Sequence, residues 1–193
     1  MTLKDDKNAK ASEIINEKYS ETFRKLSECN PIRVGFKRLN DDAIIPTKAH
    51  PTDSGFDLYA SKDVIIKPGE TTVVPTGIAV ELPPGYEATV RPRSGITAKT
   101  KLRVQLGTID NEYRGEIGVI VDNIYHDCID DEEFTFRAAG LDDEPTGDEY
   151  YPYGTYLIRK GDRIAQLVIQ PIPTVEAYEI DGDIRSTERG AGG

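Results

Sequence analysis

The chain has 193 residues, enough for one well-buried domain with additional segments, and its formal net charge is −10 at pH 7. Ten acidic residues and one arginine fall between positions 127 and 149, so this segment carries most of the negative charge. Such a distribution argues against charge-driven binding to duplex nucleic acid or to an anionic membrane. The two cysteines, Cys29 and Cys128, are too few for a disulfide framework or a cysteine zinc site, and they fit a reducing compartment. The N-terminus lacks a signal peptide's apolar core and no apolar run could span a bilayer, so we expect a cytoplasmic protein.

Residues 1–30 predict an amphipathic helical extension. Four apolar residues are spaced by four, four and three positions, which places them on one helical face: Ile15, Tyr19, Phe23 and Leu26. The Asn30-Pro31 pair supplies a stop. We expect this face to pack on its own domain or on a sister subunit. A dedicated partner-binding role is the less favoured alternative.

From residue 31 onward the pattern changes to short strands, and helical periodicity is absent. Alternating or β-branched runs are separated by turn signals such as Pro68-Gly69, and they lie at 32–36, 71–82, 86–92, 116–124 and 163–172. We therefore predict an all-β domain over 31–180, a sandwich or barrel of jelly-roll character. The acidic stretch 122–155 is interpreted as an insertion, within which EEFTFRA could form a short strand. Residues 181–193 are expected to form a flexible C-terminal arm.

Polar residues interrupt these apolar runs in five short motifs: DSGFDLYA (53–60), PRSG (92–95), GTIDNEYRG (107–115), GDRIAQL (161–167) and ERGAGG (188–193). In the second motif, Arg93 offers a planar fork of donors, Ser94 a hydroxyl, and Gly95 a close approach to the backbone, which together suit an anion. Each motif alone has an ordinary structural interpretation. Asp110 and Tyr113, for example, are typical of a β-hairpin turn.

The order and spacing of the five motifs are more specific than any one of them. Together they resemble the homotrimeric dUTPases, the dUTP nucleotidohydrolases, over about residues 32–193 without the 122–155 insertion. The resemblance implies a jelly-roll-like β-barrel of the trimeric dUTPase type. It also implies hydrolysis of dUTP to dUMP and diphosphate with Mg²⁺ as cofactor, and a homotrimer as the assembly. Such an enzyme keeps uracil out of DNA and supplies dUMP.

The resemblance further implies roles for the residues that bind the triphosphate. Asp57 would hold a metal-bound water and help to place Mg²⁺ on the phosphates. Arg93, Ser94, Gly95 and Gln166 would contact the phosphate oxygens.

Other positions would serve the reacting water, the sugar and the base. Asp110 would orient and deprotonate the attacking water and meet the 3′-hydroxyl, and a positioned base of this kind contributes about 10²–10⁴-fold. Tyr113 would pack under the deoxyribose, leaving no room for a 2′-hydroxyl. The backbone from Val104 to Thr108, which includes Gly107, would read the uracil edge. Arg189 would close over the phosphates from another subunit's tail. The family's usual aromatic residue after the Arg-Gly run is absent before Gly193.

Two alternatives stay open. A dCTP deaminase of the same superfamily needs a different acid near the base, so the GTIDNEYRG match argues against it. A regulatory interaction protein is the second alternative, because some phage members of the family carry extra segments at the position of 122–155 and bind a repressor. A phage-type member would act in the host cytoplasm. The aromatic residues within this acidic segment favour a protein partner with a basic face, whereas a solvated surface loop is the ordinary interpretation of a charge run.

Overall fold

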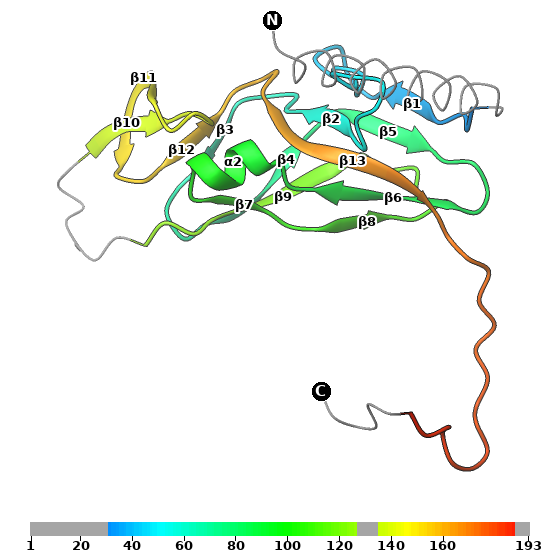
Figure 1. The fold of residues 1–193 in the computed structure, drawn as a ribbon. Coiled ribbons are helices and arrows are strands. Elements are labelled where there is room, and N and C mark those ends of the chain that lie inside the picture. Colours follow the sequence, from blue (N-terminus) through cyan, green and yellow to red (C-terminus); the bar gives the residue numbers. More distant parts are fainter. Residues whose placement is uncertain (1–30, 127–134, 188–193) are drawn as a thin grey trace, which may run out of the picture.

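The computed structural model describes residues 31–126 and 135–187, so the predicted helix over 1–30 lies outside the described residues. Within the described part the chain is all-β, as predicted, with short strands and a single short helix (Figure 1). No helix in these two ranges is long and apolar enough to cross a membrane. The jelly-roll closure of the strands stays a prediction.

The strands pair into four small sheets. Their orders are β1 (Gly35–Arg38) with β5 (Ile78–Glu81); β2 (Phe56–Tyr59), β13 (Arg163–Pro171), β6 (Tyr86–Arg91) and β8 (Gly107–Ile109); β4 (Thr71–Pro75), β9 (Gly118–Asn123) and β7 (Leu102–Val104); and β11 (Pro145–Pro152), β10 (Thr135–Ala139), β12 (Tyr156–Ile158) and β3 (Val64–Ile66). These pairs are antiparallel except for the short parallel contact between β10 and β12. The second sheet matters most here, because four of the five motifs lie on it or at its ends.

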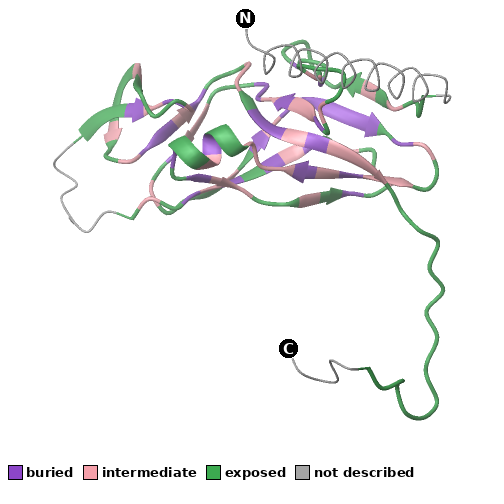
Figure 2. Cartoon of the chain, in the orientation of Figure 1, coloured by how far each residue is buried: buried purple, intermediate pink, exposed green. Residues whose placement is uncertain are grey.

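Side chains that alternate along the strands build the core. In β9, Val119 and Val121 are buried while Ile120 between them is exposed, as expected of a sheet with one covered face. Leu58 of β2 and Leu167 of β13 are fully buried in the same way. Figure 2 shows that buried residues follow the middle of the molecule.

The helix α2 (Ser94–Lys99) was not predicted from the sequence, which shows no helical periodicity after residue 31. It follows β6 directly, with Arg93 at its N-cap, so the PRSG motif forms the start of a helix. Ile96 is buried and the Thr100 backbone N–H closes the last turn on the Ile96 carbonyl at 2.9 Å. Six residues are too few to show a 3.6-residue period in the sequence.

The acidic insertion is structured over its described residues. Strands β10 and β11 form a hairpin that joins the body through β12 and β3, and Ala138 is buried. The short strand predicted in EEFTFRA is confirmed as β10. Residues 135–152 form strands rather than an irregular loop, and most of their side chains are exposed. The predicted boundary at 122 is also two residues early, since β9 continues to Asn123.

A tyrosine anchors the hairpin to the body. The Tyr156 hydroxyl donates to Asp143 Oδ1 at 2.9 Å and accepts a hydrogen bond from the Lys101 backbone N–H at 3.1 Å. Burial raises the pKa of Tyr156 to about 12, with the hydrogen bond to Asp143 adding to the increase and the Lys101 amide opposing it. The neutral phenol is therefore the form that the fold requires.

The last strand ends at Pro171, so the exposed C-terminal segment begins at residue 172, nine residues before the predicted position 181. Residues 172–187 are exposed throughout and run away from the body (Figures 1 and 2). They leave at the end of the molecule opposite the β10–β11 hairpin.

Candidate functional site

Five of the predicted site residues lie around one hollow. Asp57, Gln166 and Arg91 are register partners on the adjacent strands β2, β13 and β6, and α2 begins beside them. The hollow has a volume of about 480 Å³, and its lining includes the five predicted residues Asp57, Arg93, Ser94, Gly95 and Gln166. The structure thus brings together three motifs that are far apart in the sequence.

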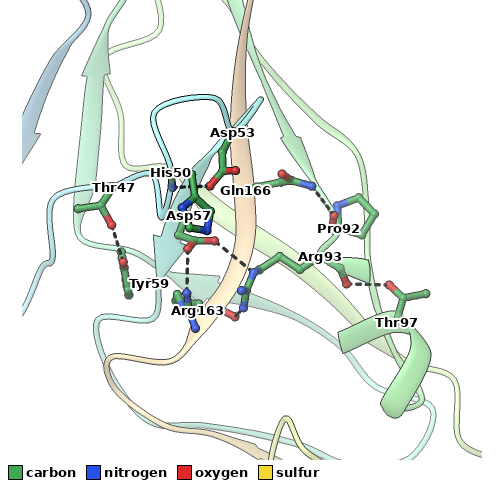
Figure 3. Close-up of polar contacts among 10 residues, drawn as sticks. All are labelled: Thr47, His50, Asp53, Asp57, Tyr59, Pro92, Arg93, Thr97, Arg163 and Gln166. Carbon is green, nitrogen blue, oxygen red and sulfur yellow. Dashed lines mark hydrogen bonds and ion pairs between the residues drawn. The ribbon is translucent and has the colours of Figure 1, made fainter. Parts of the chain in front are cut away.

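Asp57 is at the centre of a network of charges (Figure 3). Its Oδ1 lies 3.2 Å from Arg93 Nε, and its Oδ2 lies 3.3 Å from Arg163 Nη1. Arg93 Nη1 also donates to the Arg163 carbonyl at 2.9 Å. With Arg91 and Asp53, the lining holds three arginines and two aspartates. A net positive charge with several guanidinium donors suits an oxygen-rich anion.

The rest of the hollow leaves room for a ligand. Ser94 and Gly95 are exposed, and a Cβ built on Gly95 would meet nothing within 4 Å. The Gln166 amide donates to the Pro92 carbonyl at 3.0 Å, which fixes its orientation. Gly55 packs against it, since a Cβ there would lie 2.9 Å from Gln166 Oε1. The exposed backbone of Ser94 and Gly95 therefore lines the same hollow as the Gln166 side chain, whose orientation is fixed.

The remaining described residues of the prediction do not line this hollow. Val104 is on β7, Gly107 and Thr108 are on β8, and Asp110 and Tyr113 follow in the turn. Strand β8 pairs with β6 through Thr108↔Thr89 and Ile109↔Ala88, so it runs away from the α2 end of β6. At about 4.8 Å between strands and about 3.4 Å per residue, Asp110 lies roughly 20 Å from Asp57.

The turn that carries Asp110 is held rigidly but is open to solvent. The Asn111 amide donates to the Pro83 carbonyl at 2.7 Å and to the Tyr86 carbonyl at 3.2 Å. The Tyr113 hydroxyl donates to the Glu116 carbonyl at 2.9 Å, and a Cβ on Gly115 would lie 2.6 Å from Tyr113 Cζ. Glycine is thus required for the tyrosine ring to lie over the turn. Asp110 is exposed and Tyr113 is 44% exposed, so both are available to another molecule.

Arg189 lies outside the described residues. Two arginines of the hollow, Arg91 and Arg163, were not singled out from the sequence. The sequence does indicate Arg91, because this residue lies two positions before Arg93 and therefore on the same side of an extended strand. Arg163 lies three residues before Gln166, and strict alternation places these two on opposite faces.

The oxygen-bearing residues of the hollow suit Mg²⁺ that is also bound to phosphates. Among residues 31–126 and 135–187, no group of three or more His, Cys, Asp or Glu could hold a metal ion by itself. Mg²⁺ at nucleotide sites is usually bound by one or two carboxylates, several waters and the phosphates of the substrate. Both Asp57 oxygens already face arginines. The residues therefore fit Mg²⁺ carried by a polyphosphate and held to Asp57 through water, and they do not fit an all-protein metal site.

Comparisons with known proteins agree with this chemistry. A family model described as dUTPase matches residues 41–130. The chain is 40% identical over 158 residues to the deoxyuridine 5′-triphosphate nucleotidohydrolase of Gloeothece citriformis, covering 81% of this chain and 90% of that protein. It is 39% identical over 170 residues to the enzyme of the same name from Nocardia farcinica, covering 87% and 86%.

Solved structures of phage proteins are similar as well. A mutant dUTPase of Staphylococcus bacteriophage 80alpha, solved with dUpNHpp, has a TM-score of 0.76 and 33% identity, covering 83% of this chain and 95% of that one. A dUTPase from phage phi11 of S. aureus, solved to show its species-specific insert, has a TM-score of 0.73 and 33% identity, with coverage of 78% and 97%.

Proposed function

This chain belongs to the dUTPase family and is a dUTP-hydrolysing enzyme, and we propose that the hollow around Asp57 binds the triphosphate of dUTP. The observation that carries the proposal is the convergence of Asp57, Arg93, Ser94, Gly95 and Gln166 on one hollow with a net positive charge. The reaction is dUTP + H₂O → dUMP + diphosphate, with water attacking the α-phosphate.

The phosphate contacts follow from the donors present. Arg93 supplies a guanidinium beside the hollow, and Ser94 and Gly95 supply a hydroxyl and an accessible backbone N–H. Gln166 adds an amide whose orientation is fixed by Pro92. Mg²⁺, when bound with the nucleotide, offsets negative charge on the phosphates. Asp57 would hold one of its waters, and the arginines on either side keep this carboxylate in place.

Asp110 is proposed as the general base and Tyr113 as the platform for the deoxyribose. A general base must come within hydrogen-bonding reach of the water that it activates. The edge of uracil would be read by backbone groups between Val104 and Thr108, including Gly107. A pocket built on such polar pairing rejects a mismatched base by about 10⁴-fold or more.

The hollow around Asp57 and the turn that carries Asp110 can form one site only if they come from different subunits. Within one chain Asp110 lies roughly 20 Å from Asp57, which is far beyond reach of a shared phosphate. We therefore propose a homotrimer in which Asp110 and Tyr113 of one subunit face the hollow of another. The exposed arm 172–187 leaves its own body, which supports the proposal that Arg189 closes over the phosphates of a neighbour.

The decisive experiment measures diphosphate release from dUTP, dTTP, dCTP and UTP, each with and without Mg²⁺. We expect release from dUTP in the presence of Mg²⁺ and discrimination of several orders of magnitude against dCTP. We also expect discrimination against UTP, because Tyr113 leaves no room for a 2′-hydroxyl. dTTP presents the same polar edge as dUTP and can be rejected only by steric contact of its C5 methyl group. Ammonia release from dCTP would instead favour a deaminase. Equal rates with UTP and dUTP would refute the proposed packing of Tyr113 against the sugar.

A specific observation favours a second function, the binding of a regulatory protein through the 122–155 insertion. The rings of Phe136 and Tyr125 each pack edge-to-face on Tyr153, with centroids 5.1 and 5.5 Å apart, beside a hollow of about 710 Å³. Phe136, Tyr150 and Tyr153 are all about half exposed or more. Exposed aromatic rings are typical anchors of protein interfaces, and the acidic residues around them favour a partner with a basic, repressor-like face.

A further inference from the structure

The strand that carries Gln166 contains a β-bulge beside the phosphate hollow. Gln166 pairs with Asp57 and Ala165 with Leu58, but Arg163 pairs with Tyr59. Ile164 is therefore an extra residue with no partner of its own on β2. Bulges of this kind bend a strand and change the direction of its side chains, and they are frequent beside active sites.

The bulge changes which side chain faces the hollow. In a regular antiparallel pair, Ile164 would lie opposite Tyr59, and Arg163 would face away from Gln166. With the extra residue, Arg163 and Gln166 share a face and both line the hollow, while Ile164 is buried in the core. The β-bulge at Ile164 thus interrupts the regular pairing of β13 with β2, and it places Arg163 next to Arg93.

Arg163 contacts both of the other charged residues of the network. Its Nη1 lies 3.3 Å from Asp57 Oδ2, and its carbonyl accepts a hydrogen bond from Arg93 Nη1 at 2.9 Å. Arg93 holds the other oxygen of Asp57. The Asp57 side chain is only 15% exposed, whereas that of Arg163 is 49% exposed. Asp57 therefore depends on these two arginines for compensation of its charge.

We propose that Arg163 is a positioning residue for dUTP hydrolysis, which acts by holding the Asp57 carboxylate; the inference rests on the proposed phosphate site. Without Arg163, Arg93 would be the one remaining cationic partner of Asp57 in this network. The N–H donors of Arg93 would then stay bound to the Asp57 carboxylate instead of to phosphate oxygens. With Arg163 in place, Arg93 can turn its donors to phosphate oxygens while Asp57 stays compensated. Arg163 then raises substrate affinity through Asp57 and Arg93 without itself contacting the phosphates.

The first test is a double-mutant cycle on kcat and KM. Hydrogen bonds to charged groups contribute about 1.5–3 kcal/mol, so we expect Arg163→Gln to lower kcat/KM by roughly 10–150-fold, mainly through KM. In an Asp57→Asn background the same change should cost less than about threefold, because the residue through which Arg163 acts is already neutral. Arg163→Lys, which keeps the charge, should recover part of the loss. Arg159→Gln is the matched control, since it removes a nearby arginine that has no contact with Asp57.

The second test measures binding alone. Calorimetry with dUpNHpp should show about tenfold weaker binding to Arg163→Gln than to the wild type, and the same affinity for Arg159→Gln. The melting temperatures of both unliganded variants report any general loss of stability. Equal effects of Arg163→Gln in the wild-type and Asp57→Asn backgrounds would overturn the proposal, because Arg163 would then act on the nucleotide directly. Equal effects of Arg163→Gln and Arg159→Gln would overturn it too. A wild-type enzyme that bound dUpNHpp without hydrolysing dUTP would contradict the proposed function instead.

Discussion

Two variants that each lose most of their activity should regain it in part when their subunits are mixed. Asp110→Asn removes the proposed base, which contributes about 10²–10⁴-fold. Arg93→Gln removes charge-assisted hydrogen bonds to the phosphates, which contribute about 1.5–3 kcal/mol, or roughly 10–150-fold. The two positions lie far apart in one chain, with Asp110 roughly 20 Å from the hollow that Arg93 lines. The proposed site therefore needs Arg93 from one subunit and Asp110 from another.

The size of the recovery follows from this geometry. In an equal and random mixture, a hollow with intact Arg93 meets an intact Asp110 in about one quarter of the sites, because the two halves are chosen independently in a symmetric assembly. Diphosphate release from dUTP should therefore reach about one quarter of the wild-type rate after the subunits are unfolded and refolded together. Each parent alone should remain at about a tenth of the wild-type rate or less.

Controls make the outcome decisive. Mixing the two proteins without refolding reports subunit exchange in the native state, and light scattering after gel filtration reports the number of subunits. A refolded oligomer whose activity never exceeds the mean of its parents would refute the reasoning, because Arg93 and Asp110 would then act in the same chain.

Three further results are expected. Asp110→Asn by itself should lower turnover at least tenfold while leaving the affinity for dUpNHpp nearly unchanged, since Asn keeps the shape and loses the base; a smaller loss would exclude the role. Because the pKa of Tyr156 is about 12 in the folded protein and near 10 when unfolded, the neutral phenol stabilises the fold, and this stability is lost as pH rises from 10 to 12. In urea titrations across that range, Tyr156→Phe should lose less stability than the wild type. Replacing 127–152 with a short Gly/Ser turn should leave dUTP hydrolysis and assembly intact but abolish capture of a basic protein partner; capture by both forms, insensitive to salt, would contradict the partner function.

Much of the candidate site could be predicted because its residues occur in short ordered motifs. Asp57, Gly95 and Gln166 lie on separate segments, and no periodicity in the sequence brings them together. The resemblance to a family does so, and the register of β2, β13 and β6 agrees with it. The turn at Asp110 was predictable from local chemistry alone, since Asn and Gly are typical of such turns.

Features that depend on a single residue or on long-range pairing were missed. The helix α2 has six residues, fewer than two turns, so apolar periodicity cannot show it. The bulge at Ile164 leaves no mark in the sequence, because a buried isoleucine is equally expected in regular alternation. The hairpin of β10 and β11 was obscured by its acidic composition. Its stability comes from pairing and from buried positions such as Ala138, which composition does not reveal.

The exposure of the Asp110 turn and of the Asp57 hollow suggests a chemical role for the proposed assembly. Asp110 and Tyr113 lie on a turn that is fixed by Asn111 yet open to solvent, and the hollow around Asp57 is open on its ligand side. A general base in open water has no fixed water to activate, and a charged hollow in open water binds phosphate weakly because the solvent screens its charges. Docking one half against the other removes solvent from both at once. In the proposed trimer, catalysis and substrate selection therefore arise at the contact between subunits, and a variant that weakens assembly should lose activity in proportion to the fraction of dissociated subunits.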